Sequence, residues 1–202
     1  MDSEIGGFAT VAHKVLSDIL LAMKIIALAA LSLDGYMTRH DDEGNSFTSG
    51  VEKEFFARVL NTFNCSVFGS ATFDAAREQI LAAPPARRLR LVLTTRPEAY
   101  APVHKHGFLE FAAGPPREIA EKLRERGKAR CALLGGTRVF TDFLEAGLID
   151  EFWISFEPVF FGSGKRLLEG RLDRALELLG IEDLGGSVLV AKYRVPGNLS
   201  AL

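Results

Sequence analysis

Residues 131–147, CALLGGTRVFTDFLEAG, indicate how this chain folds. The apolar run at residues 131–134 stops at the pair Gly135-Gly136, and a helical pattern follows. Gly147 is placed to end that helix, because a residue without a Cβ adopts the left-handed conformation at little cost. The stretch therefore predicts a strand, a glycine turn and a helix, whose inner face carries four apolar residues: Val139, Phe140, Phe143 and Leu144.

The pair Gly135-Gly136 has two interpretations. Glycines before a helix let a ligand approach the backbone, where unpaired N–H groups and the helix dipole favour an anion such as a pyrophosphate. The alternative is a plain turn between a strand and a helix. Short glycine motifs give many false positives, so this stretch taken alone favours the plain turn.

The composition is that of an ordinary globular protein, with 202 residues, 48% of them hydrophobic and 25% charged. A net charge of −2 gives no electrostatic footprint for nucleic acid, so we expect no nucleic-acid partner. No apolar run reaches the roughly 18 residues of a membrane span, so we expect no membrane partner. Cys65 and Cys131 each open an apolar run, which predicts buried reduced thiols, no metal site and a cytoplasmic location.

Residues 1–22 form a separate N-terminal extension. Their apolar residues recur at helical spacing, so an amphipathic helix is expected, and the acidic start argues against a signal peptide. A second interpretation is that this segment is upstream sequence and that the chain proper starts at Met23. We therefore expect one domain over residues 23–202, preceded by this extension.

Strand and helix patterns alternate along most of the domain. Strands are expected at residues 24–31, 65–69, 89–93, 108–112 and 131–134, and helices at residues 51–63, 70–81, 117–126 and 137–146. A wide strand is expected at residues 148–156, covered on one side only. The last two strands, residues 175–183 and 187–195, flank Gly185-Gly186, which is a hairpin signal.

This order predicts a mixed, mainly parallel α/β sheet flanked by helices, with a C-terminal antiparallel hairpin. Ligands in such folds bind outside the carboxyl ends of parallel strands. Three strands end in glycines or hydroxyl residues, namely Gly69-Ser70, residues 94–96 (Thr-Thr-Arg) and Gly135-Gly136-Thr137. If these strands are neighbours, their ends converge, and a phosphate-bearing ligand becomes the favoured interpretation.

Four motifs in this order resemble the dihydrofolate reductase-like superfamily, and most closely the reductase domain of bacterial riboflavin biosynthesis. They are Ser32-Leu33-Asp34-Gly35, Gly69-Ser70-Ala71-Thr72, Leu134-Gly135-Gly136-Thr137, and residues 143–151 (FLEAGLIDE) followed by Pro158 and Gly162-Ser163-Gly164. The resemblance covers residues 23–195 and implies an NADPH-dependent reductase that is usually dimeric. The apolar terminal strands could pair in such a homodimer.

The resemblance also implies roles for individual residues. Gly135, Gly136 and Thr137 would hold the cofactor pyrophosphate, and Thr94, Thr95 and Arg96 would meet the 2′-phosphate of NADPH. Asp34 would lie beside the nicotinamide and the substrate. The implied cofactor-binding set is Ala30, Gly69, Ser70, Thr72, Thr94, Thr95, Arg96, Leu134, Gly135, Gly136, Thr137, Arg138 and Val139.

Two departures bear on the substrate. Tyr36 stands where the riboflavin enzymes usually have a basic residue, and the stretch after Thr72 lacks their Asp-Pro segment and the arginine that follows it. The tryptophan-proline segment of true dihydrofolate reductases is absent between Gly35 and Glu52. The expected substrate is a small heterocycle of pyrimidine or pterin type.

Reduction of a C=N or C=O group by hydride transfer benefits from a nearby acid that can protonate the product. Asp34 and Glu52 are the candidate catalytic residues, and Asp34, Glu157 and Gly164 are the candidate substrate-binding residues. Each carboxylate also has a structural explanation, a turn for Asp34 and a helix start for Glu52. The alternative function is a nucleotide-binding protein that retains the cofactor cleft without turnover.

Overall fold

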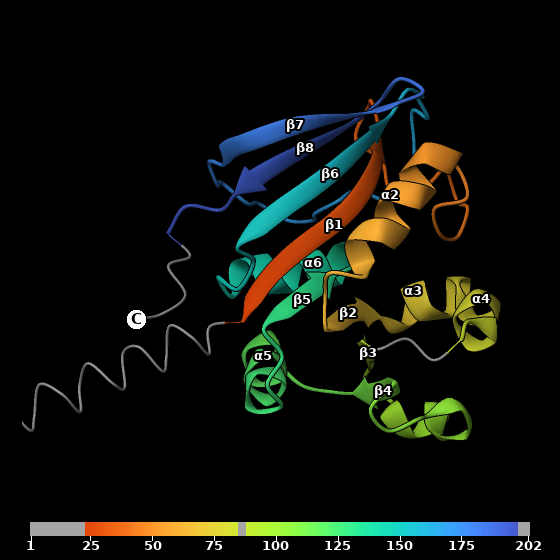
Figure 1. Cartoon of the computed structure of the whole chain (residues 1–202), viewed down its shortest axis with the longest axis vertical. Helices are drawn as coiled ribbons and strands as arrows, with labels where there is room; N and C mark the ends of the chain where they lie inside the picture. The colour runs from red at the N-terminus through yellow and green to blue at the C-terminus, as the bar shows by residue number, and fades with distance from the viewer. Residues whose placement is uncertain (1–22, 85–87, 198–202) are drawn as a thin grey trace, which may run out of the picture.

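Eight strands form one mixed sheet in the order β4-β3-β2-β5-β1-β6-β8-β7 (Figure 1). The computed structural model describes residues 23–84 and 88–197, so the helix expected within residues 1–22 lies outside the described part. The strands are β1 (Lys24–Ser32), β2 (Cys65–Gly69), β3 (Leu89–Leu93), β4 (Leu109–Ala112), β5 (Arg130–Leu133), β6 (Glu151–Glu157), β7 (Glu177–Gly185) and β8 (Val188–Arg194). The helices are α2 (Gly50–Leu60), α3 (Ser70–Ala75), α4 (Arg77–Ala82), the 3₁₀ helix η1 (Pro97–Val103), α5 (Pro116–Glu125) and α6 (Thr137–Glu145).

The strand directions confirm the predicted fold class. All pairs from β4 to β6 are parallel, because a helix or loop crossover returns the chain between them. β8 pairs antiparallel with β6 and with β7, and the β7–β8 connection turns at Gly185-Gly186. Both glycines have a positive φ, which suits them to a tight hairpin turn.

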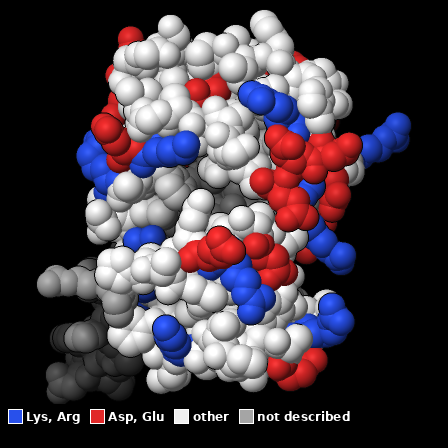
Figure 2. Space-filling view, turned by 90° about the vertical axis from the view of Figure 1, so that its right-hand side faces the viewer, with Lys and Arg blue, Asp and Glu red and all other residues white. Residues whose placement is uncertain are grey.

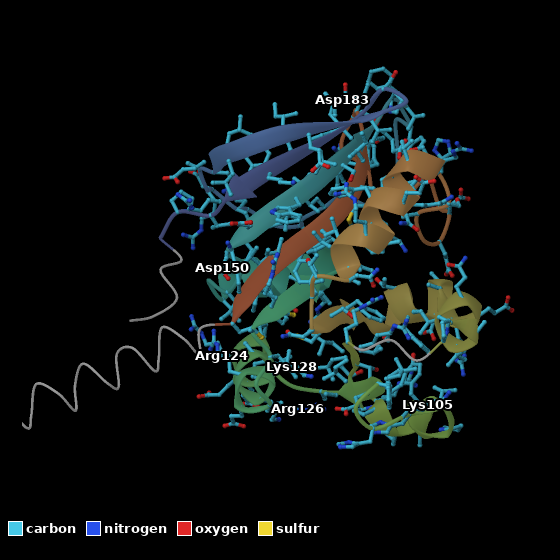
Figure 3. The ribbon with its side chains drawn as sticks, viewed as in Figure 1. Lys105, Arg124, Arg126, Lys128, Asp150 and Asp183 are labelled. Atoms are coloured by element: carbon cyan, nitrogen blue, oxygen red, sulfur yellow. The ribbon has the colours of Figure 1, made fainter. Side chains whose placement is uncertain are left out.

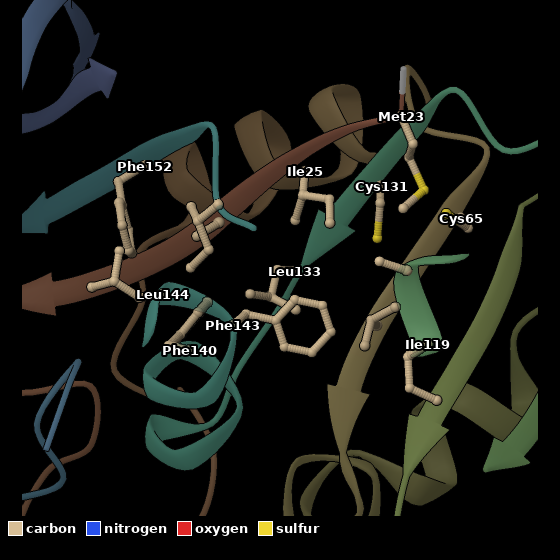
Figure 4. Close-up of a cluster of buried hydrophobic side chains, with 14 of the residues drawn as sticks. Met23, Ile25, Cys65, Ile119, Cys131, Leu133, Phe140, Phe143, Leu144 and Phe152 are labelled. Carbon is tan, nitrogen blue, oxygen red and sulfur yellow. The ribbon is translucent and has the colours of Figure 1, made fainter. Parts of the chain in front are cut away.

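Helices cover both faces of the sheet. The side chains of Phe55 and Val59 on α2 pack in one buried cluster with Ile26 of β1 and Val190 of β8. On the same face, α3 places Phe73 against Phe68 and Val92. The opposite face holds the largest cluster, into which α5 and α6 insert their apolar sides (Figure 4), including Ile119, Leu123, Phe140, Phe143 and Leu144.

Asp150 ties the beginning of β6 to the beginning of β1. Its carboxylate accepts a hydrogen bond of 2.7 Å from the N–H of Ile25, and its own N–H donates to the Ile25 carbonyl at 2.9 Å. Figure 3 places Asp150 beside the amino end of β1. The motif over residues 143–151 therefore has a structural reason, since it ends α6 and fixes the register of the central strands.

Two elements differ from expectation. The helix expected over residues 70–81 is interrupted at Ala76, where the backbone leaves the helical region (φ −113°, ψ 14°), and two six-residue helices result. The strand expected over residues 148–156 begins only at Glu151, and most of its residues are buried. α2 covers one face of this strand and α6 the other, which the imperfect alternation of its sequence could not indicate.

Cys65 and Cys131 are paired residues of β2 and β5, both are free thiols, and both are fully buried. The hydrogen bond with Cys65, together with burial, raises the pKa of Cys131 well above its usual value. Within residues 23–84 and 88–197, no helix has the length and apolar character to cross a membrane.

Candidate active site

The three strand ends predicted to converge do so. β3, β2 and β5 are successive neighbours in the sheet, and all three run in the same direction. The N–H of Gly69 donates to the carbonyl of Gly135 at 2.8 Å, which joins the ends of β2 and β5. The turn into α3 and the turn into α6 therefore lie side by side.

Backbone atoms rather than side chains line the place where the ends of β2 and β5 meet. Gly135 has φ +84°, and a Cβ built on it would lie 2.5 Å from the ring of Phe140. A Cβ on Gly69 would lie 3.2 Å from the side chain of Val139. Glycine at both positions thus allows the ends of β2 and β5 to approach the first turn of α6.

The first turn of α6 is open to an anion. Gly136 is its N-cap and has no side chain to cap the helix, so the first N–H groups have no partner from that residue. The hydroxyl of Thr72 lies 3.6 Å from the Cβ position of Gly136. Helix N–H groups without a side-chain cap, a bare backbone and an adjacent hydroxyl fit the pyrophosphate of a dinucleotide.

Other residues of the predicted cofactor set lie near this turn, and they differ in exposure and in their hydrogen bonds. Thr137 donates its hydroxyl to the backbone carbonyl of Arg166, so this hydroxyl serves the loop after β6. Arg138 is exposed and lies 3.7 Å from Asp142 of its own helix. Ser70 is half-buried in the first turn of α3, and Leu134 is half-buried at the end of β5.

Thr94, Thr95 and Arg96 leave the carboxyl end of β3, one strand beyond β2. The backbone N–H of Arg96 donates to the hydroxyl of Thr94 at 3.2 Å, and the Arg96 side chain is exposed. The guanidinium of Arg96 therefore has no carboxylate partner among the described residues, and its contact with a 2′-phosphate stays a prediction.

Asp34 is held by the loop after β6. Its carboxylate accepts hydrogen bonds from the hydroxyl of Ser32 at 2.6 Å, from the N–H of Gly162 at 2.6 Å and from the N–H of Phe161 at 3.1 Å. The hydrogen bond from Ser32, with those from the loop, lowers the pKa of Asp34. These contacts give Asp34 a structural role, and because its lowered pKa leaves the carboxyl group ionised at neutral pH, it has no proton to donate.

Gly164 is a point of close backbone approach in the same loop. It has φ +148°, and a Cβ there would overlap the carbonyl oxygen of Thr38. Lys165 donates its N–H to the Thr38 hydroxyl at 2.9 Å, and Met37 donates its N–H to the Lys165 carbonyl at 2.8 Å. Glycine is needed here to join the loop after β6 to the loop after β1, and substrate contact stays a prediction.

Glu52 and Glu157 form a buried carboxyl pair. Their exposed fractions are 4% and 3%, and they come from the first turn of α2 and the last position of β6. Burial, and then the nearby charge of Glu157, raise the pKa of Glu52 to about 7. A carboxylic acid with such a pKa can hold a proton near neutral pH and donate it.

Hydroxyl groups support this pair, and sequence reasoning missed them. Ser49 donates to Glu157 through its N–H at 2.8 Å and through its hydroxyl at 3.0 Å. Ser155 directs its hydroxyl to Glu52 at a long 3.5 Å, and Thr48 also hydrogen-bonds Glu52. Ser49 is the N-cap of α2, three residues before Glu52, so a capping-box pattern was available as a signal.

The strand register brings the carboxyl pair to the same edge as the glycine turn. β1 continues to Ser32, whereas β5 pairs with it only as far as Ala27. Beyond that point Ala30 pairs with Ser155, and Ser32 pairs with Glu157. Half-buried Ala30 thus lies between the carboxyl pair and the end of β5. Figure 2 shows this end of the molecule, which is hollowed near its centre.

A mainly parallel sheet with helices on both faces, a C-terminal hairpin, and a glycine turn before the helix after β5 define the dihydrofolate reductase-like class of fold. The chain belongs to the RibD C-terminal domain family, whose model matches residues 23–190.

Three known proteins illustrate the similarity. The chain is 25% identical over 169 residues to the uncharacterized protein YwjB of Bacillus subtilis, a match that covers 82% of this chain and 94% of that one. The bifunctional diaminohydroxyphosphoribosylaminopyrimidine deaminase/5-amino-6-(5-phosphoribosylamino)uracil reductase of Thermotoga maritima superimposes with a TM-score of 0.70 at 17% identity, covering 86% of this chain and 57% of that one. Dihydrofolate reductase from Enterococcus faecalis, in complex with NADP(H), gives a TM-score of 0.64 at 16% identity, covering 86% and 96%.

Proposed function

We propose that this protein is an NADPH-dependent reductase that transfers a hydride to a C=N or C=O group of a small heterocycle. The observation that carries the proposal is the backbone-lined turn where Gly69, Gly135 and Gly136 meet beside the hydroxyl of Thr72. Membership of a family with reductase neighbours, one of them described as a complex with NADP(H), supports the assignment.

The residues of the turn would hold NADPH by its phosphates. The N–H groups at the start of α6 and the Thr72 hydroxyl would receive the pyrophosphate, and Arg96 would pair with the 2′-phosphate. NADPH, when bound, supplies the hydride. The protein's part is to orient the two reactants and to exclude water from the reacting atoms.

Glu52 would supply the proton that balances the hydride. Its pKa of about 7 keeps a fraction of the acid protonated at neutral pH, and Ala30 separates it from the glycine turn by the width of one strand. Glu157, fixed by Ser49, would remain beside it as the second carboxyl group. A substrate that presents N–H donors to this pair, as a pyrimidine or pterin does, would satisfy both groups.

A binding titration followed by a substrate panel tests this function. Calorimetry should show tight binding of NADPH and weak binding of NADH, and one or more heterocyclic C=N or C=O substrates should then oxidise the cofactor. Tight binding with no oxidation across a broad panel would favour a nucleotide-binding protein without turnover. Binding of neither nucleotide would contradict both functions and leave the glycine pair as a turn.

A further inference from the structure

Three arginines gather on one face of the sheet, away from the candidate active site. Ser66 of β2 pairs with Arg90 of β3 on one side and with Ala132 of β5 on the other. Side chains two residues apart on a strand share a face, so Arg88 lies with Arg90, and Arg130 lies with Ala132. The strand register thus places Arg90 directly beside Ser66, with β-carbons about 5 Å apart, and places Arg88 and Arg130 at diagonal positions on its two sides, about 7–8 Å away.

These arginines are half-buried and lack counter-ions. The Nε atoms of Arg88 and Arg130 and the hydroxyl of Ser66 are buried without a hydrogen-bond partner in the described part of the chain, and Ser66 is only 1% exposed. None of the three arginines takes part in an ion pair within residues 23–84 and 88–197. Lys24, which pairs with Arg130 across β1 and β5, already binds Glu151 at 2.6 Å.

The arrangement is electrostatically unfavourable as it stands. Burial lowers the pKa of Arg88, and the positive charge of Arg90 lowers it further. Burial also lowers the pKa of Arg90. An arginine nevertheless remains charged at neutral pH, so like charges stay close together in a partly dry environment. Buried charges in proteins are usually paired, and here the described chain offers no negative partner.

Packing alone explains part of this cluster. The aliphatic stems of arginines can cover an otherwise open stretch of sheet, and the guanidinium of Arg130 lies over the ring of Phe63 at 5.0 Å. Neither contact satisfies the buried Nε donors or the hydroxyl of Ser66, however. The remaining N–H groups of these half-buried arginines have no carboxylate partner in the described chain, and a guanidinium binds phosphate through two parallel N–H groups.

We propose that Arg88, Arg90 and Arg130, grouped around Ser66, form a binding site for a phosphate group. The site lies at the amino ends of β3 and β5, whereas the cofactor turn lies at the carboxyl ends of β2 and β5. It is therefore a second site, and it does not depend on the proposed reductase function.

The direct test is a phosphate titration of the full chain, followed by the backbone amide signals in two-dimensional NMR. Inorganic phosphate should move the signals of Ser66, Arg90 and Arg130 saturably, and chloride at equal ionic strength should not. A parallel titration with glycerol phosphate separates free phosphate from a phosphate ester, since the natural form should bind more tightly. Signals that move only at the glycine turn, or not at all, would overturn the proposal.

Variants identify the residues responsible. The double change Arg88→Gln with Arg90→Gln should weaken phosphate binding by about tenfold or more, because each removes a charge-assisted hydrogen bond. Arg174→Gln is the matched control, since Arg174 is exposed and far along the chain, and it should leave the dissociation constant unchanged. If the double variant fails to fold, Arg90→Lys keeps the charge, and its loss of the two-pronged contact should still weaken binding. Wild-type affinity in the folded variants would contradict the assignment.

Discussion

Glu52 and Glu157 are two acids in a space that water scarcely reaches. Two buried carboxyl groups side by side resist losing both protons, because the second negative charge would face the first in a medium of low dielectric constant. Burial and the charge of Glu157 both raise the pKa of Glu52, whereas the hydrogen bonds from Ser155 and Thr48 lower it. Glu52 can therefore hold a proton near neutral pH, close to where the proposed reaction needs one.

This pair predicts a stability that depends on pH. The pKa of Glu52 is raised from 4.5 to about 7 on folding, so the folded state binds its proton more tightly than the unfolded state does. The free energy of unfolding should therefore fall as pH rises from about 5 to about 7, by about 2–3 kcal/mol, and then level off. Glu52→Gln should remove most of this fall in urea unfolding experiments.

Two further measurements bear on the same interpretation. Glu157→Gln removes the neighbouring charge, so it should lower the pKa of Glu52 and shift the fall in stability to lower pH. Glu54→Gln is the control, since Glu54 is exposed on the same helix and should leave the wild-type profile in place. Profiles of wild type and Glu52→Gln that coincide over this range would show that Glu52 titrates normally.

Arg96 is predicted to distinguish the two nicotinamide nucleotides. Arg96→Ala should weaken NADPH binding by about 1.5–3 kcal/mol, the usual range for a hydrogen bond to a charged group, and should leave NADH binding nearly unchanged. Calorimetric titrations of both nucleotides measure this, with Arg174→Ala as the matched exposed arginine. Equal losses for the two nucleotides would remove the 2′-phosphate assignment.

At the scale of elements, the turn between β5 and α6 is the most constrained connection at the site. Gly135 has a positive φ, and the ring of Phe140 occupies the space where a Cβ would lie. Gly127 has φ +69° and open space around the position of its Cβ. Gly127→Ala should therefore cost only the backbone strain, about 1 kcal/mol, while Gly135→Ala should cost about 2–4 kcal/mol because it adds a steric clash with the core.

Chemical unfolding of the two variants separates these contributions. A similar loss for Gly135→Ala and Gly127→Ala would mean that Phe140 moves aside without cost. The larger loss, accompanied by weaker NADPH binding, would show that the packing of α6 fixes the turn.

Sequence patterns were sufficient for the elements whose boundaries are set locally. The apolar runs of β2 and β3 end where glycine and hydroxyl residues indicate, and Gly147 follows α6. The break at Ala76 was not visible, because an alanine carries no signal for a helix interruption and the neighbouring pattern is helical on both sides. Tertiary packing around α3, not local preference, decides that boundary.

The candidate site likewise has one part that local sequence patterns predict and one part that they do not. The glycine turn could be predicted because a glycine at the end of an apolar run indicates a turn without any knowledge of the tertiary structure. The carboxyl pair could not, because Glu52 and Glu157 are 105 positions apart and meet only through the packing of α2 on β6. The arginine cluster around Ser66 likewise depends on the register of three strands, which single-strand patterns do not give.

At the scale of the whole molecule, the β7–β8 hairpin leaves one edge of the sheet open. Within the described residues β7 pairs only with β8, and apolar side chains are exposed here, including Leu178 at 55%, Ile181 at 63% and Leu189 at 45%. Exposed apolar edges are usual sites of association between chains. We propose that this edge forms the interface of a homodimer.

The dimer proposal predicts a clear effect of charge at that edge. Ile181→Lys should convert a dimer into a monomer in analytical ultracentrifugation, because the interface would have to bury an unpaired ammonium group. Phe108→Lys is the control, since Phe108 is 46% exposed just before the opposite edge strand β4 and should leave the dimer intact. A wild-type protein that sediments as a single species near its chain mass of 22.1 kDa would contradict the proposal.

Binding of NADPH where β2 and β5 end can be observed directly in an NMR titration of the isotope-labelled protein with NADPH. The amide signals of Gly69, Gly135 and Gly136 should move first and most, with Arg96 following for NADPH and not for NADH. Signals that move only around Ser66 and Arg90, or only along β7, would contradict this placement of NADPH, since the cofactor would then bind elsewhere.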